Sequence, residues 1–568
     1  MYILGISCFY HDAAASLLKD GEIVAAAQEE RFTRKKHDDS FPTQAINYCF
    51  KEAGIDISQV DYIGFYDKPL LKFERILESY IDNFPKSWRA FIAAMSVWLS
   101  KKLWIKEVIK NKLQYRGEIY FINHHLSHAA SSFLVSPFDT SAILTVDAVG
   151  EWATATFGIG RGKDIKILKE INWPHSLGML YSAFTYYLGF RVNDAEYKVM
   201  GAAPYGKPVY TDLIKKELID IKEDGSFKLN LDYFEYPYGF RMVNKKFENL
   251  FGEPRRTPES KIEQRHWDLA ASIQEVTNEI TIKMANHLYR ETGLKNICLA
   301  GGVALNCVSN SKILNNSPFE NIFIQPAAGD AGGALGVALY IDNAVLGNDR
   351  KIQWEHSFWG PSFSNEKVKE FLDKKGLEYH QFDNETLVKK VAQLIAKQKV
   401  VGWFQGRMEW GPRALGNRSI IADARNKENW RKVNLKIKFR ESFRPFAPTV
   451  LEEKSEDYFE IPKGVLGRKT PTSYMLLIAK VKEEKRKEIP AVTHIDGTAR
   501  LQTISREQNP LYYDLIKEFD KITGCPVIIN TSFNVRGEPI IHSPEDAYNC
   551  FMKTGMDCLV INNFLLLK

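Results

Sequence analysis

The sequence contains little cysteine, and its cysteines form no pattern. Seven cysteines in 568 residues are an odd number, are scattered and include no CxxC pair. They are Cys8, Cys49, Cys298, Cys307, Cys525, Cys550 and Cys558. A disulfide framework and a cysteine zinc site are therefore both disfavoured. We expect reduced thiols, buried as small hydrophobic side chains.

Long apolar runs are also missing. The opening residues, Met1 to Ser7, show no basic segment followed by a long apolar stretch. The most apolar later run, Phe91 to Leu99, is far too short to span a bilayer. We therefore expect a cytoplasmic protein without a membrane partner.

The net charge is small, but it is unevenly distributed. The whole chain carries +6, whereas eleven Lys or Arg stand against four Asp or Glu between Gln405 and Val450. A basic face for nucleic acid is one explanation of such a segment. Its arginines alternate with Trp410, Phe443 and Pro445, a mixture that is more typical of a shaped pocket. We expect this pocket to bind an anion rather than a nucleic acid.

The order of short apolar segments predicts an α/β protein with an internal duplication. Three β-prone segments near the start are echoed by three more after Ala142, each set beginning with a strand that ends at a polar residue. These segments are 2–7, 13–18 and 22–27, then 143–147, 153–159 and 165–171. Strand, glycine turn and helix then alternate between residues 297 and 341, which is typical of α/β folds.

Length and linker composition predict two domains. A chain of 568 residues is too long for one hydrophobic core. The polar, turn-rich stretch from Asn343 to Gln353 resembles a linker, so we place the domains at 1–350 and 351–568.

The sequence of residues 71–113 predicts an amphipathic, Lys-rich helical insertion. We interpret it as a solvated arm in preference to a membrane-surface helix.

Two closely spaced histidines predict a metal site. If residues 123–129 open a helix, His124 and His128 lie one turn apart on one face and can bind the same ion. A carboxylate is needed as well, and Asp330, in a glycine-rich turn, is the best candidate. Two histidines and one carboxylate leave coordination positions open, which suits a catalytic Fe(II) or similar divalent ion. Alternatively, the histidines could cap a helix or fill the core. The presence of Asp147 and Asp330 in glycine turns favours the metal site over this alternative.

Two small-residue loops are candidates for binding a nucleotide. They contain Gly201 in one case, and Gly301, Gly302 and Asn306 in the other. Small side chains let backbone N–H groups approach an anion. Tight packing of helix on sheet explains either loop alone equally well. Neither loop matches GxxxxGK[ST], so a Walker-type NTPase is disfavoured.

Ordered motifs along the whole chain resemble the O-carbamoyltransferase family, which includes the nodulation-factor, cephamycin and tobramycin O-carbamoyltransferases. The motifs occupy 11–15, 28–31, 124–130, 200–206, 301–306 and 329–333 in the first half, and 407–419, 444–448, 493–502 and 530–534 in the second. The resemblance implies an N-terminal duplicated actin-like ATPase (ASKHA) domain related to tRNA threonylcarbamoyl-transfer enzymes. It also implies a C-terminal α/β domain similar to threonylcarbamoyl-AMP synthase.

The resemblance also implies roles for single residues. His124, His128 and Asp330 match the family's iron ligands, His11 its general base, and Asp147 a neighbour that orients substrate or metal.

In the second half, phosphate binding calls for arginine or lysine. The candidates that contact phosphate or the developing charge are Arg413, Lys438, Arg444 and Arg500. Ser532 and Asn534 are expected to hold the nucleotide or its Mg²⁺-bound phosphate, and Arg418 is a further cofactor-binding candidate.

The expected activity is ATP-dependent O-carbamoyl transfer. Carbamoyl phosphate and ATP would give carbamoyl-AMP in the second domain, and a hydroxylated small molecule would accept the carbamoyl group at the metal site of the first. Acceptor contacts are expected within 70–115 and 230–256, where Tyr233, Phe234, Tyr236, Tyr238 and Phe240 either stack on a sugar or pack locally. The alternatives are a tRNA-modifying threonylcarbamoyl enzyme and an ASKHA sugar kinase. A homodimer is one option for the oligomeric state, which the sequence leaves open.

Overall fold

A computed structural model describes residues 1–441, 443–462, 465–467 and 469–568. The chain forms two compact units. The first unit comprises residues 1–24, 39–42 and 49–352, and the second comprises 25–38, 43–48 and 353–568. The segments 25–38 and 43–48, which the sequence analysis assigned to the first domain, therefore cluster with the second unit.

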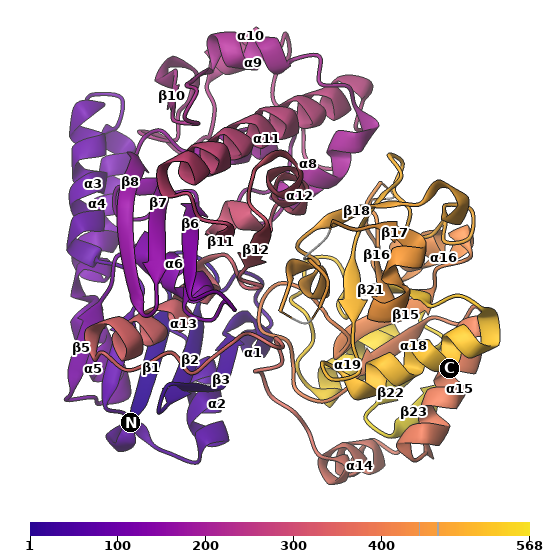
Figure 1. The fold of residues 1–568 in the computed structure, drawn as a ribbon. Helices are drawn as coiled ribbons and strands as arrows, with labels where there is room; N and C mark the ends of the chain where they lie inside the picture. Colours follow the sequence, from indigo (N-terminus) through magenta and orange to yellow (C-terminus); the bar gives the residue numbers. More distant parts are fainter. Residues whose placement is uncertain (442, 463–464, 468) are drawn as a thin grey trace. The chain divides into compact units, whose positions relative to one another are not determined.

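The first sheet of the chain has the strand order β3-β2-β1-β4-β5 (Figure 1). Strand β1 is antiparallel to β2 and parallel to β4, and β4 is parallel to β5. The strands are β1 (Tyr2–Ser7), β2 (Ala14–Lys19), β3 (Glu22–Gln28), β4 (Tyr62–Phe65) and β5 (Glu118–Phe121).

The second sheet repeats this arrangement. Its order is β12-β11-β6-β7-β8, with β6 antiparallel to β7 and parallel to β11. The strands are β6 (Thr140–Val146), β7 (Ala153–Arg161), β8 (Asp164–Asn172), β11 (Asn296–Ala300) and β12 (Asn321–Ile324). Order and direction match the first sheet strand for strand, so the expected duplication within an α/β fold is confirmed.

Helices α6 (His124–Phe133) and α13 (Asp330–Tyr340) pack against each other in the first unit. Their backbones approach so closely that a Cβ on Gly336 would lie 1.9 Å from the carbonyl oxygen of Ser127. Glycine is therefore required at this position. The close approach sets the first turn of α13 beside the histidines of α6.

The expected helical insertion lies between β4 and β5. It consists of α3 (Pro69–Asp82), α4 (Trp88–Ser100), a 3₁₀ turn (Lys102–Trp104) and α5 (Ile105–Leu113), with α3 packed against α4. Among the described residues, every helix is too short or too polar to cross a membrane.

The other elements of the first unit follow β8. They are α7 (Leu177–Tyr187), α8 (Glu196–Ala202), α9 (Thr211–Glu217), β9 (Ile219–Ile221), β10 (Phe227–Leu229), α10 (Lys245–Leu250), α11 (Gln264–Thr292) and α12 (Cys307–Asn316). Helix α11 leads directly into β11. It ends at Gly293, whose φ of +63° is the left-handed conformation that glycine adopts at helix ends.

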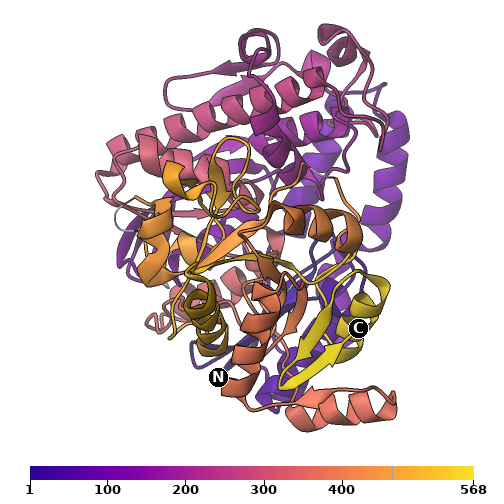
Figure 2. The ribbon, with the colours of Figure 1, turned by 90° about the vertical axis from the view of Figure 1, so that its right-hand side faces the viewer.

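The second unit contains an eight-stranded mixed sheet with the order β13-β23-β22-β14-β15-β21-β16-β20, and the chain ends just after β23 (C in Figures 1 and 2). Its strands are β13 (His380–Gln381), β14 (Val401–Phe404), β15 (Arg418–Asp423), β16 (Ala447–Leu451), β20 (Gln502–Ile504), β21 (Val527–Ser532), β22 (Cys558–Ile561) and β23 (Phe564–Leu567). Along β21, Val527 and Ile529 join one buried cluster and Ile528 joins another. This alternation shows that both sheet faces are covered, as the apolar run in the sequence requires.

Helices and a small sheet complete the second unit. The small sheet has the order β17-β18-β19, with β17 (Phe459–Glu460), β18 (Ile478–Val481) and β19 (Thr498–Arg500). The helices are α1 (Glu30–Thr33), α2 (Thr43–Ala53, which continues into the first unit), α14 (Asn365–Lys374), α15 (Asn384–Ala396), α16 (Lys427–Lys432), α17 (Ser455–Tyr458), α18 (Pro510–Thr523) and α19 (Pro544–Lys553).

Candidate functional site

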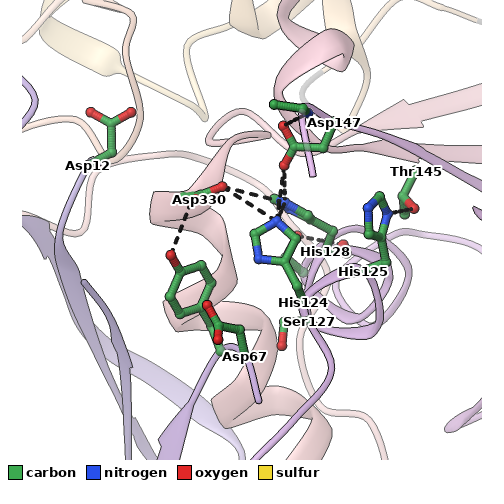
Figure 3. A network of polar contacts seen from close by, with 12 residues as sticks. Asp12, Asp67, His124, His125, Ser127, His128, Thr145, Asp147 and Asp330 are labelled. Atoms are coloured by element: carbon green, nitrogen blue, oxygen red, sulfur yellow. Dashed lines mark hydrogen bonds and ion pairs between the residues drawn. The ribbon is translucent and has the colours of Figure 1, made fainter. Parts of the chain in front are cut away.

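Four buried side chains of the first unit converge on one point (Figure 3). His124 and His128 lie on successive turns of α6, Asp147 directly follows β6, and Asp330 begins α13. One ligand atom from each of the four lies within 4.8 Å of the others. His125, between the two histidines in sequence, instead makes a 2.7 Å hydrogen bond with the hydroxyl of Thr145.

The distances between these atoms suit a single metal ion. The Nε2 atoms of His124 and His128 are 3.1 Å apart, and Oδ2 of Asp147 lies 3.1 and 2.8 Å from them. Oδ1 of Asp330 lies 3.7 and 3.8 Å from the same two nitrogens. Ligands about 2.1 Å from one ion are separated by about 3.0 to 3.4 Å. The four side chains therefore fit a divalent ion with little movement.

Burial sets the charge of the cluster. Burial lowers the pKa of His124 well below its ordinary range, so its imidazole is neutral and can donate a lone pair to a metal. Burial raises the pKa of Asp330, and the nearby charge of Asp147 adds to this rise even though His11 opposes it. A divalent cation would relieve the repulsion between these two buried carboxylates.

Glu151, which the sequence analysis missed, orients the histidine helix. Asn123, the N-cap residue of α6, makes no side-chain capping bond. Instead, the Glu151 carboxylate accepts hydrogen bonds from the backbone N–H of His124 at 3.0 and 3.1 Å and from that of Lys68 at 2.8 Å. This cap matters because the Nδ1 atoms of His124 and His128 are buried without a hydrogen-bond partner among the described residues. The orientation of the His124 and His128 rings therefore depends on packing and on the position of α6, which the Glu151 cap holds.

Two further residues surround Asp330. The Tyr66 hydroxyl donates to Asp330 Oδ2 at 3.1 Å, a contact that no sequence signal indicated. Nε2 of His11 lies 3.7 Å from the same oxygen, and its Nδ1 lies 3.0 Å from Asp12 Oδ2. Burial lowers the pKa of His11, but Asp330 and Asp12 outweigh it and raise the pKa to about 10. The His11 side chain is 29% exposed, so it occupies the accessible side of a buried cluster.

The glycine turn after β11 packs directly on the end of β6. A Cβ on Gly301 would lie 2.3 Å from the carbonyl oxygen of Val146, and Gly301 has a φ of +91°. A Cβ on Gly302 would lie 2.9 Å from Asp147 Oδ1. These glycines therefore position Asp147, a purpose that the sequence analysis did not foresee.

The other predicted nucleotide contacts of the first unit have structural partners. Asn306 caps α12 by accepting from the N–H of Ser309 at 3.1 Å, and its amide donates to Gln274 at 3.1 Å. Gly201 lies in the last turn of α8, not in a loop as expected. Its sequence, rich in small residues, continues a helix because nothing in it breaks one before Pro204. A backbone N–H inside a helix is already used, so Gly201 is a poor phosphate ligand.

A second cluster forms in the second unit where β21 ends. The Lys438 ammonium donates to the carbonyl and hydroxyl of Ser532 and to the carbonyl and side-chain oxygens of Asn534, the last at 2.6 Å. Ser532 is the final residue of β21 rather than a loop residue. The structure thus brings three predicted residues together.

This second cluster is cationic. Burial, followed by the charges of Arg440 and Arg444, lowers the pKa of Lys438 well below its ordinary range. Arg440 was not among the predicted residues. Arg444 is half-buried, with its guanidinium 3.8 Å from Glu441. Arg413 is half-buried in a loop, and Arg500 ends β19 opposite Ile478. Lys438, with the charges of Arg440 and Arg444 acting on it at the end of β21, suits an anionic ligand.

Arg418 requires a correction. It is fully buried and donates from its two terminal nitrogens to the carbonyl oxygens of Gln405, Asn417, Pro361 and Gly406, at 2.5 to 3.2 Å. Its guanidinium also lies 3.6 Å from the centre of the Phe404 ring. Arg418 therefore ties loops to the core and is not available to a cofactor.

Some of the aromatic residues expected to contact the acceptor are buried, and others are exposed. Tyr233 and Phe234 are buried, and Phe234 packs on Phe247 with ring centres 5.9 Å apart. These two are local packing residues. Tyr236 packs against Trp173 at 5.4 Å, and Phe240 is 72% exposed.

The first unit therefore contains four buried side chains that could hold a metal ion, and the second unit contains a buried lysine close to two arginines. Residues 2–339 match the family description "Carbamoyltransferase N-terminus", and residues 392–568 match "Carbamoyltransferase C-terminus". The chain belongs to the carbamoyltransferase family and is a carbamoyltransferase enzyme, as the motif resemblance implied.

Related proteins extend over the whole chain. A Synechocystis sp. protein designated sll1178 is 53% identical, over all of this chain and 97% of its own length. Nodulation protein NolNO of Sinorhizobium fredii is 38% identical, over 99% of this chain and 79% of its own. Nodulation protein NolO of Bradyrhizobium diazoefficiens is 39% identical, over 79% of each chain.

Among solved structures, full-length HypF in a phosphate- and nucleotide-bound form covers 61% of this chain and 56% of its own, with 13% identity and a TM-score of 0.32. A ROK hexokinase from Thermus thermophilus covers 60% of this chain and 98% of its own, with 14% identity and a TM-score of 0.28. The repeated strand order within the chain itself defines the fold of the first unit.

Proposed function

We propose that this carbamoyltransferase is ATP-dependent and transfers a carbamoyl group to a hydroxyl of a sugar or secondary metabolite. Water attacks carbamoyl phosphate, the bond to the phosphate group breaks, and carbamate, inorganic phosphate and a proton are formed. An oxygen of the carbamate attacks the α-phosphorus of ATP, which gives carbamoyl-AMP and pyrophosphate. The acceptor hydroxyl then attacks the carbamoyl carbon, the bond to the AMP oxygen breaks, and the carbamate ester, AMP and a proton are released.

The first two steps are assigned to the second unit. Lys438, Arg440 and Arg444 supply positive charge, and Ser532 and Asn534 supply the oxygens that fix the ammonium. Both substrates are phosphate anions, and preorganised cations stabilise the charge that develops when pyrophosphate leaves. Arg413 and Arg500 remain proposed contacts to the same phosphates, and Mg²⁺ is expected to accompany ATP.

The transfer step is assigned to the first unit. His124, His128, Asp147 and Asp330 are proposed to hold Fe(II) or a similar divalent ion, which as a Lewis acid would polarise the carbamoyl oxygen. His11, on the accessible side of this cluster, is proposed to take the proton from the acceptor hydroxyl once a bound cation offsets the charge of Asp330 that raises the pKa of His11. Tyr66 and Glu151 keep the carboxylate and the histidine helix in place.

One observation carries the proposal: four buried metal-ligand side chains converge in the first half of a chain whose two halves both match carbamoyltransferase descriptions. The test supplies the purified chain with carbamoyl phosphate, ATP, Mg²⁺ and a panel of hydroxylated sugars and secondary metabolites. Pyrophosphate and AMP are quantified, and products are searched for a mass gain of one carbamoyl group.

We expect pyrophosphate release that requires carbamoyl phosphate, and AMP release that increases with an acceptor. Threonine with bicarbonate serves as the matched substrate control, since a threonylcarbamoyl enzyme would use that pair. Release of ADP instead of AMP would indicate a kinase. Turnover with threonine and bicarbonate in place of carbamoyl phosphate, or release of ADP instead of AMP, would refute the proposal.

A further inference from the structure

Arg75, on helix α3 of the insertion, is buried and forms no ion pair within the part of the chain that the structure describes. It is only 6% exposed, and its Nε has no hydrogen-bond partner among the described residues. Burial lowers the pKa of its guanidinium to about 10. A buried charge is normally paired, because desolvation of an unpaired ion is costly.

The nearest carboxylates are committed to other groups. Asp67 Oδ2 pairs with the Lys72 ammonium at 2.7 Å. The Glu151 carboxylate accepts from the backbone N–H groups of Lys68 and His124. Both carboxylates act on Arg75 through their charge, and neither forms an ion pair with it in the described chain.

The Arg75 guanidinium is held in one orientation by aromatic stacking. It lies 4.9 Å from the centre of the Trp173 ring. The indole is fixed in turn, because its Nε1 donates to Ser79 at 2.8 Å and its ring packs edge-on against Tyr236. A guanidinium stacked on an indole keeps its N–H edge for a planar or tetrahedral anion.

A second cation of the insertion, Lys102, lies over the ring of Tyr10. The Lys102 ammonium lies 4.3 Å from the centre of the Tyr10 ring, and Tyr10 directly precedes His11. The Lys72 ammonium lies 3.5 Å from the same ring. Burial, followed by the charge of Lys72, lowers the pKa of Lys102 to about 8. Two lysines of the insertion therefore place positive charge around Tyr10, the residue that precedes the proposed base in sequence.

We propose that Arg75, assisted by Lys102, is the anion subsite for the acceptor, so that the acceptor carries a carboxylate or phosphate group in addition to the hydroxyl that is carbamoylated. This inference rests on the proposed function, because it assumes that the acceptor meets the metal cluster from the side of the insertion. The subsite positions the acceptor by its charge, and His11 and the cluster act on its hydroxyl. Arg75 is a specificity-determining residue.

The first test measures thermal unfolding of the full chain and of Arg75→Met, which has a similar volume and no charge. Without added anion, we expect Arg75→Met to unfold at the same temperature as the parent or higher, because an unpaired buried charge is removed. Glucuronate or glucose 6-phosphate at about ten times its dissociation constant should raise the unfolding temperature of the parent by about 1 to 2 °C and leave Arg75→Met unchanged. Glucose with sodium chloride at equal ionic strength is the control.

Arg75→Lys keeps the charge and loses the fork of donors, so it should respond to the anions less than the parent. Compared at equal concentration, the two acidic probes distinguish a carboxylate from a phosphate acceptor by which one stabilises the parent more. Loss of several degrees in Arg75→Met without anion, or equal responses of the parent and Arg75→Met to both anions, would overturn the proposal.

A second test uses the transfer reaction with neutral and acidic sugars of the same ring. We expect the parent to favour the acidic member by at least about tenfold in kcat/KM, and Arg75→Met to lose this preference without a change in pyrophosphate release. A parent that carbamoylates both members equally would refute the subsite alone. Absence of pyrophosphate with carbamoyl phosphate and ATP would instead refute the proposed function, and the unfolding test would still decide on the subsite.

Discussion

The two clusters of this enzyme consist of side chains with opposite chemical character. In the first unit, imidazoles and carboxylates from α6, β6 and α13 are buried together and present lone pairs to a cation. In the second unit, Lys438 is buried against backbone and side-chain oxygens at the end of β21, with Arg440 and Arg444 nearby. One cluster suits a metal ion and the other suits a polyanion, because each environment would repel the ligand of the other.

The difference would explain why two units serve the proposed reaction. In that reaction, activation of carbamate requires the charge of ATP to be neutralised, whereas transfer requires a polarised carbamoyl oxygen and a base. A single pocket would need the arginines and the metal-binding carboxylates within ion-pairing distance, where they would neutralise each other. Variants that affect one cluster should therefore leave the other cluster functional.

His128→Ala should have the largest effect on the first cluster. It removes one of two imidazoles from a buried site, so metal content should fall to background and carbamoyl transfer by at least about a hundredfold. Pyrophosphate release should persist. Elemental analysis and the two product assays check this result. His125→Gln is the matched control, because His125 lies on the same helix but bonds Thr145. Unchanged metal content in His128→Ala would show that His128 is not a ligand of the metal.

Lys438→Met should have the largest effect on the second cluster. Loss of one preorganised cation is expected to lower pyrophosphate release by about 10² to 10³, without any change in bound metal. The initial rate of pyrophosphate formation and the metal content provide the measurements. Lys436→Met, at an exposed lysine two residues earlier, controls for the loss of charge. If both lysine variants lost activity equally, the assignment of Lys438 would fail.

Asp147→Asn sharpens the description of the metal cluster. Asp147 Oδ2 is nearer to the histidine nitrogens than Asp330 Oδ1 is, so we expect the amide to weaken metal binding by about 10- to 100-fold. This loss should equal or exceed that of Asp330→Asn, because both carboxylates would be ligands. Metal titration of the two apoproteins provides the comparison. A normal affinity in Asp147→Asn would return Asp147 to the role of an orienting neighbour.

Glu151→Gln should have the smallest effect. It weakens the cap of α6, so unfolding free energy should fall by about 1 kcal/mol and metal affinity by less than about tenfold. Ser543→Ala, which removes the cap of α19 in the second unit, should lower stability similarly without changing metal affinity. Chemical denaturation and metal titration distinguish the two. If both variants changed metal affinity equally, a specific role for Glu151 would be excluded.

Much of this arrangement was predictable from local sequence. The hairpins at residues 2–27 and 140–172 follow from alternating apolar residues and glycine turns, and their similarity predicted the duplicated sheets. The spacing of His124 and His128 predicted one shared helix face because helical periodicity is local. Lys438, Ser532 and Asn534 were selected by residue type within the resemblance, and the end of β21 brings them together.

Other features could not be predicted because they depend on contacts between distant segments. Glu151 caps α6 from 27 residues away, and Tyr66 reaches Asp330 across 264 residues. Arg418 had the same sequence signal as a phosphate-binding arginine, but burial against four carbonyls gives it a structural role. Arg31 joins the second unit by donating to the carbonyl of Gly411, 380 residues later.

The sequence by itself determined the elements and the kinds of side chain at each centre, because apolar periodicity, glycine turns and ligand chemistry are properties of short segments. Only the tertiary structure decided which carboxylates face the histidines, that Arg418 is buried in the core, and that Arg75 is buried without an ion-pair partner among the described residues. These outcomes depend on burial and on distances between side chains far apart in sequence, and desolvation gives the same residue a different charge and role in each place.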